Sequence, residues 1–172
     1  MEEYIIAGLG FIVPFWILYN RSDKVVKKGV CVILENSQNI KGIIHLESRH
    51  SQTYVKCDIN GLTNGKHGLH VHTSANVSDG CKSTCNHYNP TNKTHGDCNG
   101  TNRHKGDFGN IFSDVNLHCE TEVIADVTLE EIIGRTFVIH ENEDDLGKET
   151  NAESLITGNA GKRVACGIIG HL

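Results

Sequence analysis

The sequence predicts an all-β domain, an antiparallel β-sandwich that carries two long loops. Short segments rich in valine and isoleucine alternate partly with polar residues, as half-buried strands do, and turn formers such as Asn60-Gly61 separate them. The strand-like segments span residues 25–35, 40–47, 53–59, 109–114, 121–129, 135–140 and 163–170. The sequence contains no clear amphipathic helix pattern, and a length of 172 residues suits one domain with a sizeable core.

Two polar stretches form the predicted long loops. The first runs from about Thr73 to Lys105 and is rich in Asn, Gly, Thr, Ser, His and Cys, and the second runs from Glu141 to Lys162. Loops of this length without structure of their own are uncommon inside a compact domain. Something other than its own packing must therefore hold the first loop in place.

The N-terminal residues 1–24 are expected to form an apolar extension of the domain at residues 25–172. The stretch 4–19 carries no charge, but its 16 residues fall short of the roughly 20 that cross a bilayer as a helix. Acidic residues precede it and basic residues follow it, which by the positive-inside rule leaves the rest of the chain on the cytoplasmic side. This favours a membrane-associated anchor over an atypical signal peptide or a packed extension. The net charge of −5 argues against nucleic acid as the main partner.

The sharpest chemical signal is His70-Val71-His72, which lies on a predicted strand. Side chains two apart on a strand project from the same face, so both imidazoles can reach one ion. His140 ends a later strand-like segment, where its ring could point back toward this pair. Two ordinary surface histidines are the alternative interpretation of the pair.

The first long loop and its end supply three more histidines and a carboxylate, at His87, His95, His104 and Asp107. This donor set suits a tetrahedral zinc ion, which accepts nitrogen and oxygen ligands. A metal would explain how a polar loop stays ordered, because the binding energy becomes folding energy. The alternative is a mobile loop that contains histidines by chance.

Several further motifs agree with these donors. They are GLHVH (68–72), GCKSTCNHYNP (80–90), HGD (95–97), RHKGDFGN (103–110), GRTFVIHENEDDLGK (134–148) and GNAGKRVACGIIG (158–170). From about Lys28 to the C-terminus the chain closely resembles copper–zinc superoxide dismutase of the intracellular eukaryotic type. The resemblance implies an immunoglobulin-like Greek-key β-sandwich or barrel of about eight antiparallel strands.

The resemblance also implies one copper ion and one zinc ion per subunit. The implied ligands are His70, His72, His87 and His140 for copper, and His87, His95, His104 and Asp107 for zinc. His87 would then bridge both metals through its two ring nitrogens. Asp144 matches the carboxylate that links a copper histidine to a zinc histidine, and Cys81 with Cys166 matches the intrasubunit disulfide.

The implied activity is the disproportionation of superoxide to dioxygen and hydrogen peroxide, in antioxidant defence. Arg163 matches the guanidinium that holds the incoming anion, and His87 is the expected proton carrier. The resemblance further implies a homodimer and allows a copper-delivery partner. An intracellular location is favoured, with membrane association through residues 4–19, and secretion is the alternative.

The chain departs from the family pattern at several positions. Ile156 stands where the family often has a steering lysine, and Ala152 replaces a usual glutamate, so we expect altered long-range steering with unchanged chemistry. Cys85 and Cys98 are additional cysteines in the first loop, and we expect a second disulfide between them, with two free thiols as the alternative. The remaining cysteines are expected to be buried free thiols: Cys31, Cys57 and Cys119.

Three other functions compete with this hypothesis. A non-catalytic copper-binding module would be favoured by loss of a copper ligand or of the arginine, but His140 and Arg163 are both present. A zinc hydrolase would need an open position on zinc, which Asp107 closes as a fourth ligand. A purely structural metalloprotein would be distinguished by an assay for superoxide disproportionation.

Overall fold

The computed structural model describes residues 26–34 and 36–172. The predicted extension at residues 1–24, with its apolar stretch 4–19, lies outside the described residues. Within the described ranges, no helix is long and apolar enough to cross a membrane.

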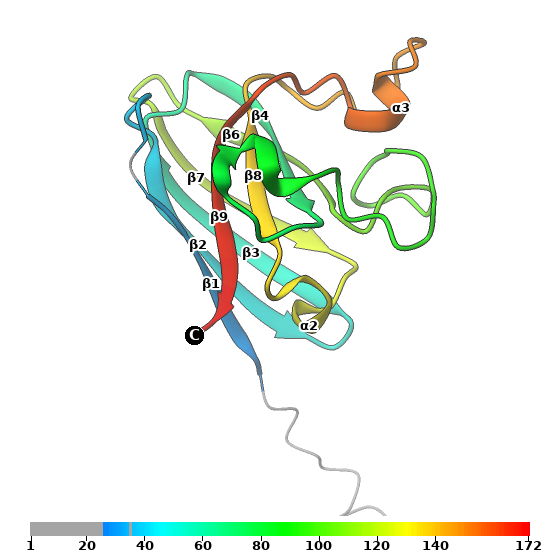
Figure 1. Ribbon diagram of the computed structural model, residues 1–172, viewed down its shortest axis with the longest axis horizontal. Coiled ribbons are helices and arrows are strands. Elements are labelled where there is room, and N and C mark those ends of the chain that lie inside the picture. The colour runs from blue at the N-terminus through cyan, green and yellow to red at the C-terminus, as the bar shows by residue number, and fades with distance from the viewer. Residues whose placement is uncertain (1–25, 35) are drawn as a thin grey trace, which may run out of the picture.

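Eight strands of the described chain form one antiparallel sheet that curls into a nearly closed barrel (Figure 1). They are β1 (Lys28–Ile33), β2 (Lys41–Arg49), β3 (Gln52–Asn60), β4 (Gly65–His72), β6 (Asp107–Ser113), β7 (His118–Ala125), β8 (Thr136–His140) and β9 (Arg163–His171). Their order in the sheet is β6-β4-β8-β9-β1-β2-β3-β7, and the end strands β6 and β7 also pack together. The chain crosses the barrel between β3 and β4, as a Greek key requires. The structure thus confirms the all-β fold of about eight antiparallel strands.

The core fills the inside of the barrel because inward residues alternate with outward ones along the strands. Cys31 of β1 lies opposite Ile44 of β2, which lies opposite Cys57 of β3, and all three side chains are fully buried. Phe108 and Phe137 meet edge to face in the same core, with ring centroids 5.2 Å apart. Burial of these apolar side chains from water is the main term that stabilises the barrel.

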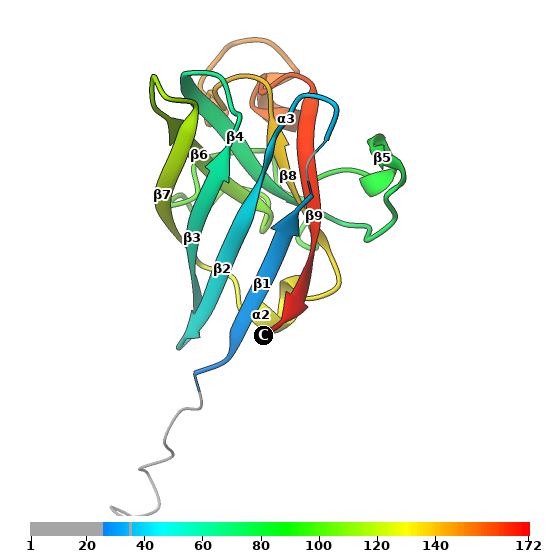
Figure 2. The same ribbon diagram turned by 90° about the vertical axis from the view of Figure 1, so that its left-hand side faces the viewer.

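Strand β9 joins the two halves of the sheet. It pairs with β1 on one side, where Ile169 lies opposite Cys31, and with β8 on the other, where Cys166 lies opposite Val138 (Figure 2). A disulfide links Cys166 to Cys81 at the end of the short strand β5 (Ser78–Cys81). The first long loop is therefore covalently attached to the barrel.

The short elements in the connections were not predicted from the sequence. They are β5, the 3-10 helix η1 (Lys82–Thr84), α2 (Leu129–Ile132) and α3 (Ser154–Thr157). Each has only three or four residues, too few to show a periodic pattern. The predicted strand at 121–129 ends instead at Ala125, because Thr128 and Glu131 form a capping box that starts α2.

The expected second disulfide is not formed, since Cys85 and Cys98 are both free thiols in the structure. The two cysteines lie in different parts of the first loop. Cys85 is exposed at the end of η1, whereas Cys98 is half-buried against the backbone of Gly109 in β6. Cys31, Cys57 and Cys119 are buried free thiols, as expected.

Candidate metal centre

Four histidines from three parts of the chain meet outside the barrel wall. Their potential ligand atoms all lie within 4.8 Å of one another, and we call them the four-histidine cluster: His70, His72, His87 and His140. His70 and His72 lie on the outer face of β4, while Leu69 and Val71 between and beside them enter the core. The loops cover this outer face, so β4 is buried on both sides.

Backbone carbonyls set the orientation of two of these rings. Nδ1 of His72 donates to the carbonyl oxygen of Cys85 at 2.8 Å, and Nδ1 of His140 donates to that of Gly161 at 3.0 Å. A neutral imidazole that donates from one nitrogen presents a bare lone pair on the other. In both rings that other nitrogen, Nε2, faces the cluster without a hydrogen-bond partner.

Asp144 orients two more rings, one with each carboxylate oxygen. Nε2 of His70 donates to Oδ2 at 2.8 Å, and Nε2 of His95 donates to Oδ1 at 2.7 Å. Nδ1 is left unpaired in both rings. The carboxylate is itself fixed, because the backbone N–H of Asp144 donates to the side chain of Asn110, whose amide donates back to the carbonyl of Asp144.

Five buried ring nitrogens in the described part of the chain have no hydrogen-bond partner. They are Nδ1 of His70 and His95 and Nε2 of His72, His87 and His140. A buried polar atom without a partner costs about 1–3 kcal/mol. Five together, four of them from one cluster, fit a site in which lone pairs are donated to a metal ion.

A second set of donors converges on one oxygen of Asp107. Oδ1 lies 2.9 Å from Nδ1 of His87, 3.0 Å from Nδ1 of His95 and 3.1 Å from Nδ1 of His104. Nδ1 of His87 and Nδ1 of His104 are 3.4 Å apart. We call these four residues the His–Asp cluster.

The separations in the His–Asp cluster suit a metal site. Ligands about 2.0 Å from a tetrahedral zinc ion stand about 3.3 Å apart. Oδ1 of Asp107 lies 2.9–3.1 Å from the three Nδ1 atoms, and those of His87 and His104 are 3.4 Å apart. Nδ1 of His95 is near Asp107 but not aligned for a hydrogen bond, as expected of a ligand that points at an ion instead. Around this second set of donors, the group of four whose ligand atoms all lie within 4.8 Å of one another is His70, His87, His95 and Asp107, with His70 in the place where the sequence implies His104. Asp144 holds Nε2 of His70.

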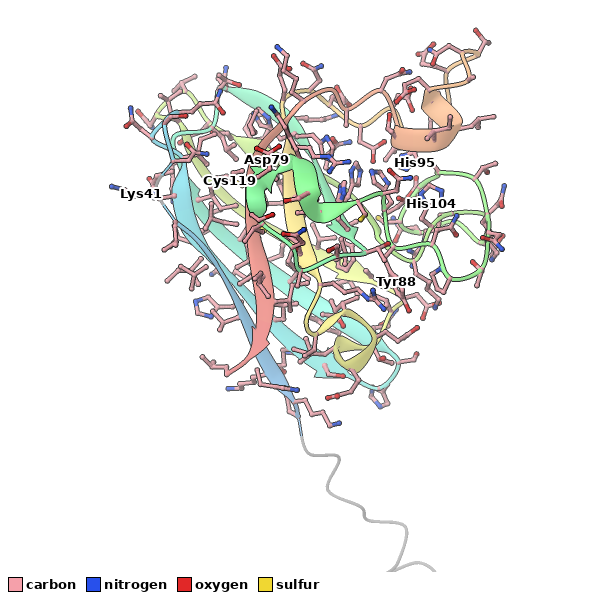
Figure 3. The ribbon with its side chains drawn as sticks, in the orientation of Figure 1. Lys41, Asp79, Tyr88, His95, His104 and Cys119 are labelled. Carbon is pink, nitrogen blue, oxygen red and sulfur yellow. A yellow bond between two sulfur atoms is a disulfide. The ribbon has the colours of Figure 1, made fainter. Side chains whose placement is uncertain are left out.

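Figure 3 labels His95 and His104, which lie together beside α3 on the side where the long loops gather. Their ring centroids are 5.6 Å apart. His87 supplies Nδ1 to the His–Asp cluster and Nε2 to the four-histidine cluster. One imidazole therefore connects the two sets of donors.

Burial and neighbouring charges keep the four-histidine cluster neutral. Burial lowers the pKa of His72 to about 2 and that of His140 to about 4, and it holds the pKa of His70 well below its usual range. Burial opposes the charge of His95 too, but the carboxylates of Asp107 and Asp144 outweigh it and raise its pKa to about 9. Neutral imidazoles with bare nitrogens are the form that binds metals.

Arg163 stands at the start of β9 beside the four-histidine cluster. Its Nη1 donates to the carbonyl of Cys81 at 2.9 Å and lies 3.2 Å from the hydroxyl oxygen of Thr84. The Cys81–Cys166 disulfide fixes the loop that offers these acceptors. Arg163 is thereby held while part of its guanidinium remains accessible.

A cavity of about 880 Å³ reaches these donors from solvent. Its lining includes His87, His104, His140 and Arg163. A small ligand that enters the cavity therefore comes close to both the Arg163 guanidinium and the imidazole rings of the centre.

Gly158 makes room for the hydrogen bond between Asp144 and His95. Its φ of +68° is in the left-handed region, which favours glycine. A Cβ atom at this position would collide with Oδ1 of Asp144 and Nε2 of His95. The motif at 158–170 contains Gly158, but the sequence does not reveal this close approach.

Two buried side chains near the site were not assigned a role from the sequence. His67 is flanked by the carbonyls of His140 and Thr63, each 2.8 Å from a ring nitrogen. Arg103 donates to the carbonyls of His104 and Asp126, which ties the loop to the chain after β7. Nothing in their sequence context distinguishes these two residues from surface side chains.

Comparison with known proteins shows which family the chain belongs to. Residues 40–169 match the model of the family described as copper/zinc superoxide dismutase (SODC). The chain belongs to the copper/zinc superoxide dismutase family. Its activity is accordingly superoxide dismutation, an oxidoreductase reaction, and the family implies copper and zinc as cofactors.

Relatives of the superoxide dismutase family cover most of the chain. Superoxide dismutase (Cu-Zn) A of Xenopus laevis is 43% identical over 147 residues, which are 83% of this chain and 97% of that protein. The extracellular superoxide dismutase (Cu-Zn) of Brugia pahangi is 43% identical over 150 residues, 81% of this chain and 74% of that protein. The crystal structure of the clock protein EA4 superposes with a TM-score of 0.80 at 39% identity, covering 86% of this chain and 96% of that one.

Proposed function

We propose that the four-histidine cluster holds copper, that the His–Asp cluster holds zinc, and that superoxide is disproportionated in the cavity beside them. The observation that carries this assignment is the set of unpaired buried nitrogens, four of which face one point. An all-imidazole site suits copper, whereas three imidazoles and a carboxylate in a tetrahedral arrangement suit zinc. With four protein donors, the His–Asp cluster leaves no open position for a hydrolytic water, which argues against a zinc hydrolase.

The reaction converts two superoxide anions and two protons into dioxygen and hydrogen peroxide. Copper, when bound, supplies the one-electron exchange between the two anions. Arg163 holds each anion at the cavity floor, since a planar, permanently charged guanidinium with several donors suits a small oxyanion. Its bonds to Cys81 and Thr84 keep it in place before the substrate arrives.

His87 is proposed to carry a proton for peroxide formation. Its Nδ1 belongs to the His–Asp cluster, so the ring is held from one side, and the residue lines the cavity. Nε2 is buried and has no protein partner that competes for a proton. Asp144 is a positioning residue, because it orients His70 and His95 rather than touching the substrate.

The test is metal content combined with activity. The purified chain, loaded with one equivalent each of copper and zinc, is expected to disproportionate superoxide, and removal of copper alone should abolish the reaction. His140→Gln should lose copper while it retains zinc, because His140 belongs to one cluster only. A protein that takes up both metals fully and leaves superoxide untouched would refute the proposal.

We also infer that the chain forms a homodimer through the outer faces of β1 and β9. Val32, after Cys31 on β1, and Ile168, before Ile169 on β9, adjoin the opposed pair Cys31 and Ile169, and the two residues are 46% and 45% exposed. Two β-branched side chains on one sheet face are suited to burial against a second copy. Ile168→Glu should give a monomer in sedimentation experiments, and an unchanged sedimentation coefficient would contradict the interface.

An intracellular location is proposed for the domain. Five free thiols in the described residues are typical of a reducing compartment, in which thiols stay unpaired. Membrane association through residues 4–19 and a copper-delivery partner remain predictions from the sequence. Fractionation of cells that express the full chain or residues 25–172 would test the location and the anchor together.

A further inference from the structure

The cavity over the metal centre differs in charge from the chain as a whole. Three cationic and two anionic side chains line it, giving a formal charge of +1, whereas the whole chain carries −5. The cations are Lys93, Lys162 and Arg163, and the anions are Glu141 and Glu153. An anionic substrate is therefore repelled by the protein at long range and depends on the local charges near the entrance.

Two of the three cations are already engaged. Nζ of Lys93 donates to the carbonyl of Thr101 within the first loop, and this hydrogen bond restricts the movement of the side chain. Arg163 is fixed on Cys81 and Thr84 at the floor. Both charges contribute to the field of the cavity, but these hydrogen bonds hold the two side chains in place.

Lys162 has a fixed backbone and a mostly exposed side chain. Glu141 N–H donates to the carbonyl of Lys162 at 2.8 Å, and the preceding carbonyl, that of Gly161, accepts from His140. The side chain is 85% exposed, and its ion pair with Oε2 of Glu141 is loose, with Nζ 3.7 Å away. An ammonium group is thus anchored next to Arg163 and extends into solvent.

We propose that Lys162 steers superoxide into the cavity and hands it to Arg163, and that Glu141 limits this effect by pairing with Lys162. The proposal rests on the assignment of the cavity as the site of superoxide turnover. The other position expected to steer, Ile156, lines the same cavity with a half-exposed apolar side chain and contributes no charge. Lys162 therefore takes over this role from a different part of the second loop.

The expected effects are small per charge and sensitive to salt. A unit charge about 10 Å from an anion in water changes its local concentration about two-fold, and at 0.1 M salt this distance equals about one Debye length. At low ionic strength, Lys162→Gln should lower kcat/KM about two-fold and Lys162→Glu about four-fold. Glu141→Gln, which frees Lys162 and removes a negative charge, should raise kcat/KM about two-fold.

The matched control is Lys56→Gln. Lys56 lies on β3, pairs with Glu120 of β7 and does not line the cavity, yet its loss changes the net charge by the same amount. All variants are compared with the copper- and zinc-loaded wild-type protein at about 0.01 M and about 0.5 M salt. Copper and zinc content and the circular dichroism spectrum establish that each variant is folded and loaded.

A second measurement does not depend on turnover. Azide, a small anion that ligates copper(II), is titrated into each loaded protein and followed by its optical absorption. Lys162→Gln should weaken azide binding about two-fold at low salt, Glu141→Gln should strengthen it, and Lys56→Gln should leave it unchanged.

The proposal would be supported if Lys162→Gln lowered and Glu141→Gln raised both kcat/KM and azide affinity at low salt, and if these changes vanished at high salt. It would be overturned by unchanged rates and azide affinities in Lys162→Glu, or by equal effects of Lys162→Gln and Lys56→Gln, which would indicate net charge alone. A loaded wild-type protein without activity would instead refute the proposed function, while the azide titration would still decide the role of Lys162.

Discussion

The Nε2 atom of His70 on β4 donates to Oδ2 of Asp144 in the second loop at 2.8 Å, and both side chains are fully buried. Oδ1 of the same carboxylate accepts from Nε2 of His95 at 2.7 Å. His70 belongs to the four-histidine cluster and His95 to the His–Asp cluster. The two clusters are therefore connected twice, through the ring of His87 and through the carboxylate of Asp144.

Asp144→Asn should weaken metal binding at both clusters. An amide cannot accept two N–H donors on two charged oxygens, so at least one of the two rings loses its orientation. Loss of such a partner typically lowers metal affinity about 10–100-fold. Competition titrations with zinc and copper chelators would measure the change. Glu143→Gln, which removes an exposed neighbouring carboxylate, should have no effect, and unaltered affinities in Asp144→Asn would contradict the bridging role.

The sequence predicts that several of these histidines come together, because their spacing follows backbone geometry. His70 and His72 are two apart on a strand, and the period of a strand places both rings on one face. The donors of the first loop were predictable as a set, since a polar loop without a core needs a ligand. The hydrogen bonds that orient His72 and His140 are accepted by the backbone carbonyls of Cys85 and Gly161. Every residue has a backbone carbonyl, so the sequence does not identify which ones accept these bonds.

Other features escaped prediction because they depend on distances between remote segments. The absence of a bond between Cys85 and Cys98 follows from where the folded loop puts each thiol, not from their separation in the chain. The hydrogen bond from the side chain of Asn36 to the carbonyl of Val164, across 128 residues, is equally invisible. Pairings of this kind are fixed by the tertiary fold, which local patterns describe only in outline.

Leu117→Gly should stabilise the protein. Leu117 sits in the turn between β6 and β7 with a φ of +62°, and its carbonyl accepts from the N–H of Gly61. The left-handed conformation costs a side chain-bearing residue about 1–2 kcal/mol, which exceeds the entropy cost of a glycine. We expect a gain of about 1 kcal/mol in the free energy of unfolding, measured by urea denaturation. Val115→Gly, at a neighbouring position without positive φ, should give no gain, and a loss at Leu117→Gly would show that its half-exposed side chain contributes more than the strain.

The metal-free protein should lose stability as the pH falls from about 6.5 to about 5. The pKa values of His72 and His140 are lowered to about 2 and about 4 in the fold, below the value of 6.5 in the unfolded chain. In this window the unfolded state binds more protons, so protonation favours unfolding. The elevated pKa of His95 has the opposite sign, but it acts between about 6.5 and 9. His72 and His140 each contribute a loss of about 1–2 kcal/mol between pH 6.5 and 5. His70 and His87, whose pKa values burial also lowers, act in the same direction.

Urea unfolding of the metal-free protein at pH 7 and pH 5 would measure this loss. His72→Gln should reduce the difference between the two pH values, because one of the titrating groups is gone. Equal free energies of unfolding at both pH values in the unsubstituted protein would contradict the burial of neutral imidazoles.

The free thiols should differ sharply in reactivity with iodoacetamide. Burial raises the pKa of Cys31 to about 12 and that of Cys57 well above its usual range, so their reactive thiolates are scarce as well as inaccessible. Cys85 is exposed and unbonded, and it should be alkylated in the native protein at pH 7.5 at least about 100-fold faster than either. Peptide mass spectrometry after timed labelling gives the rates, with Cys85→Ser as the control that removes the fast site. If neither Cys85 nor Cys98 reacted before a reductant was added, the two would be joined after all, because a disulfide leaves no thiol to alkylate.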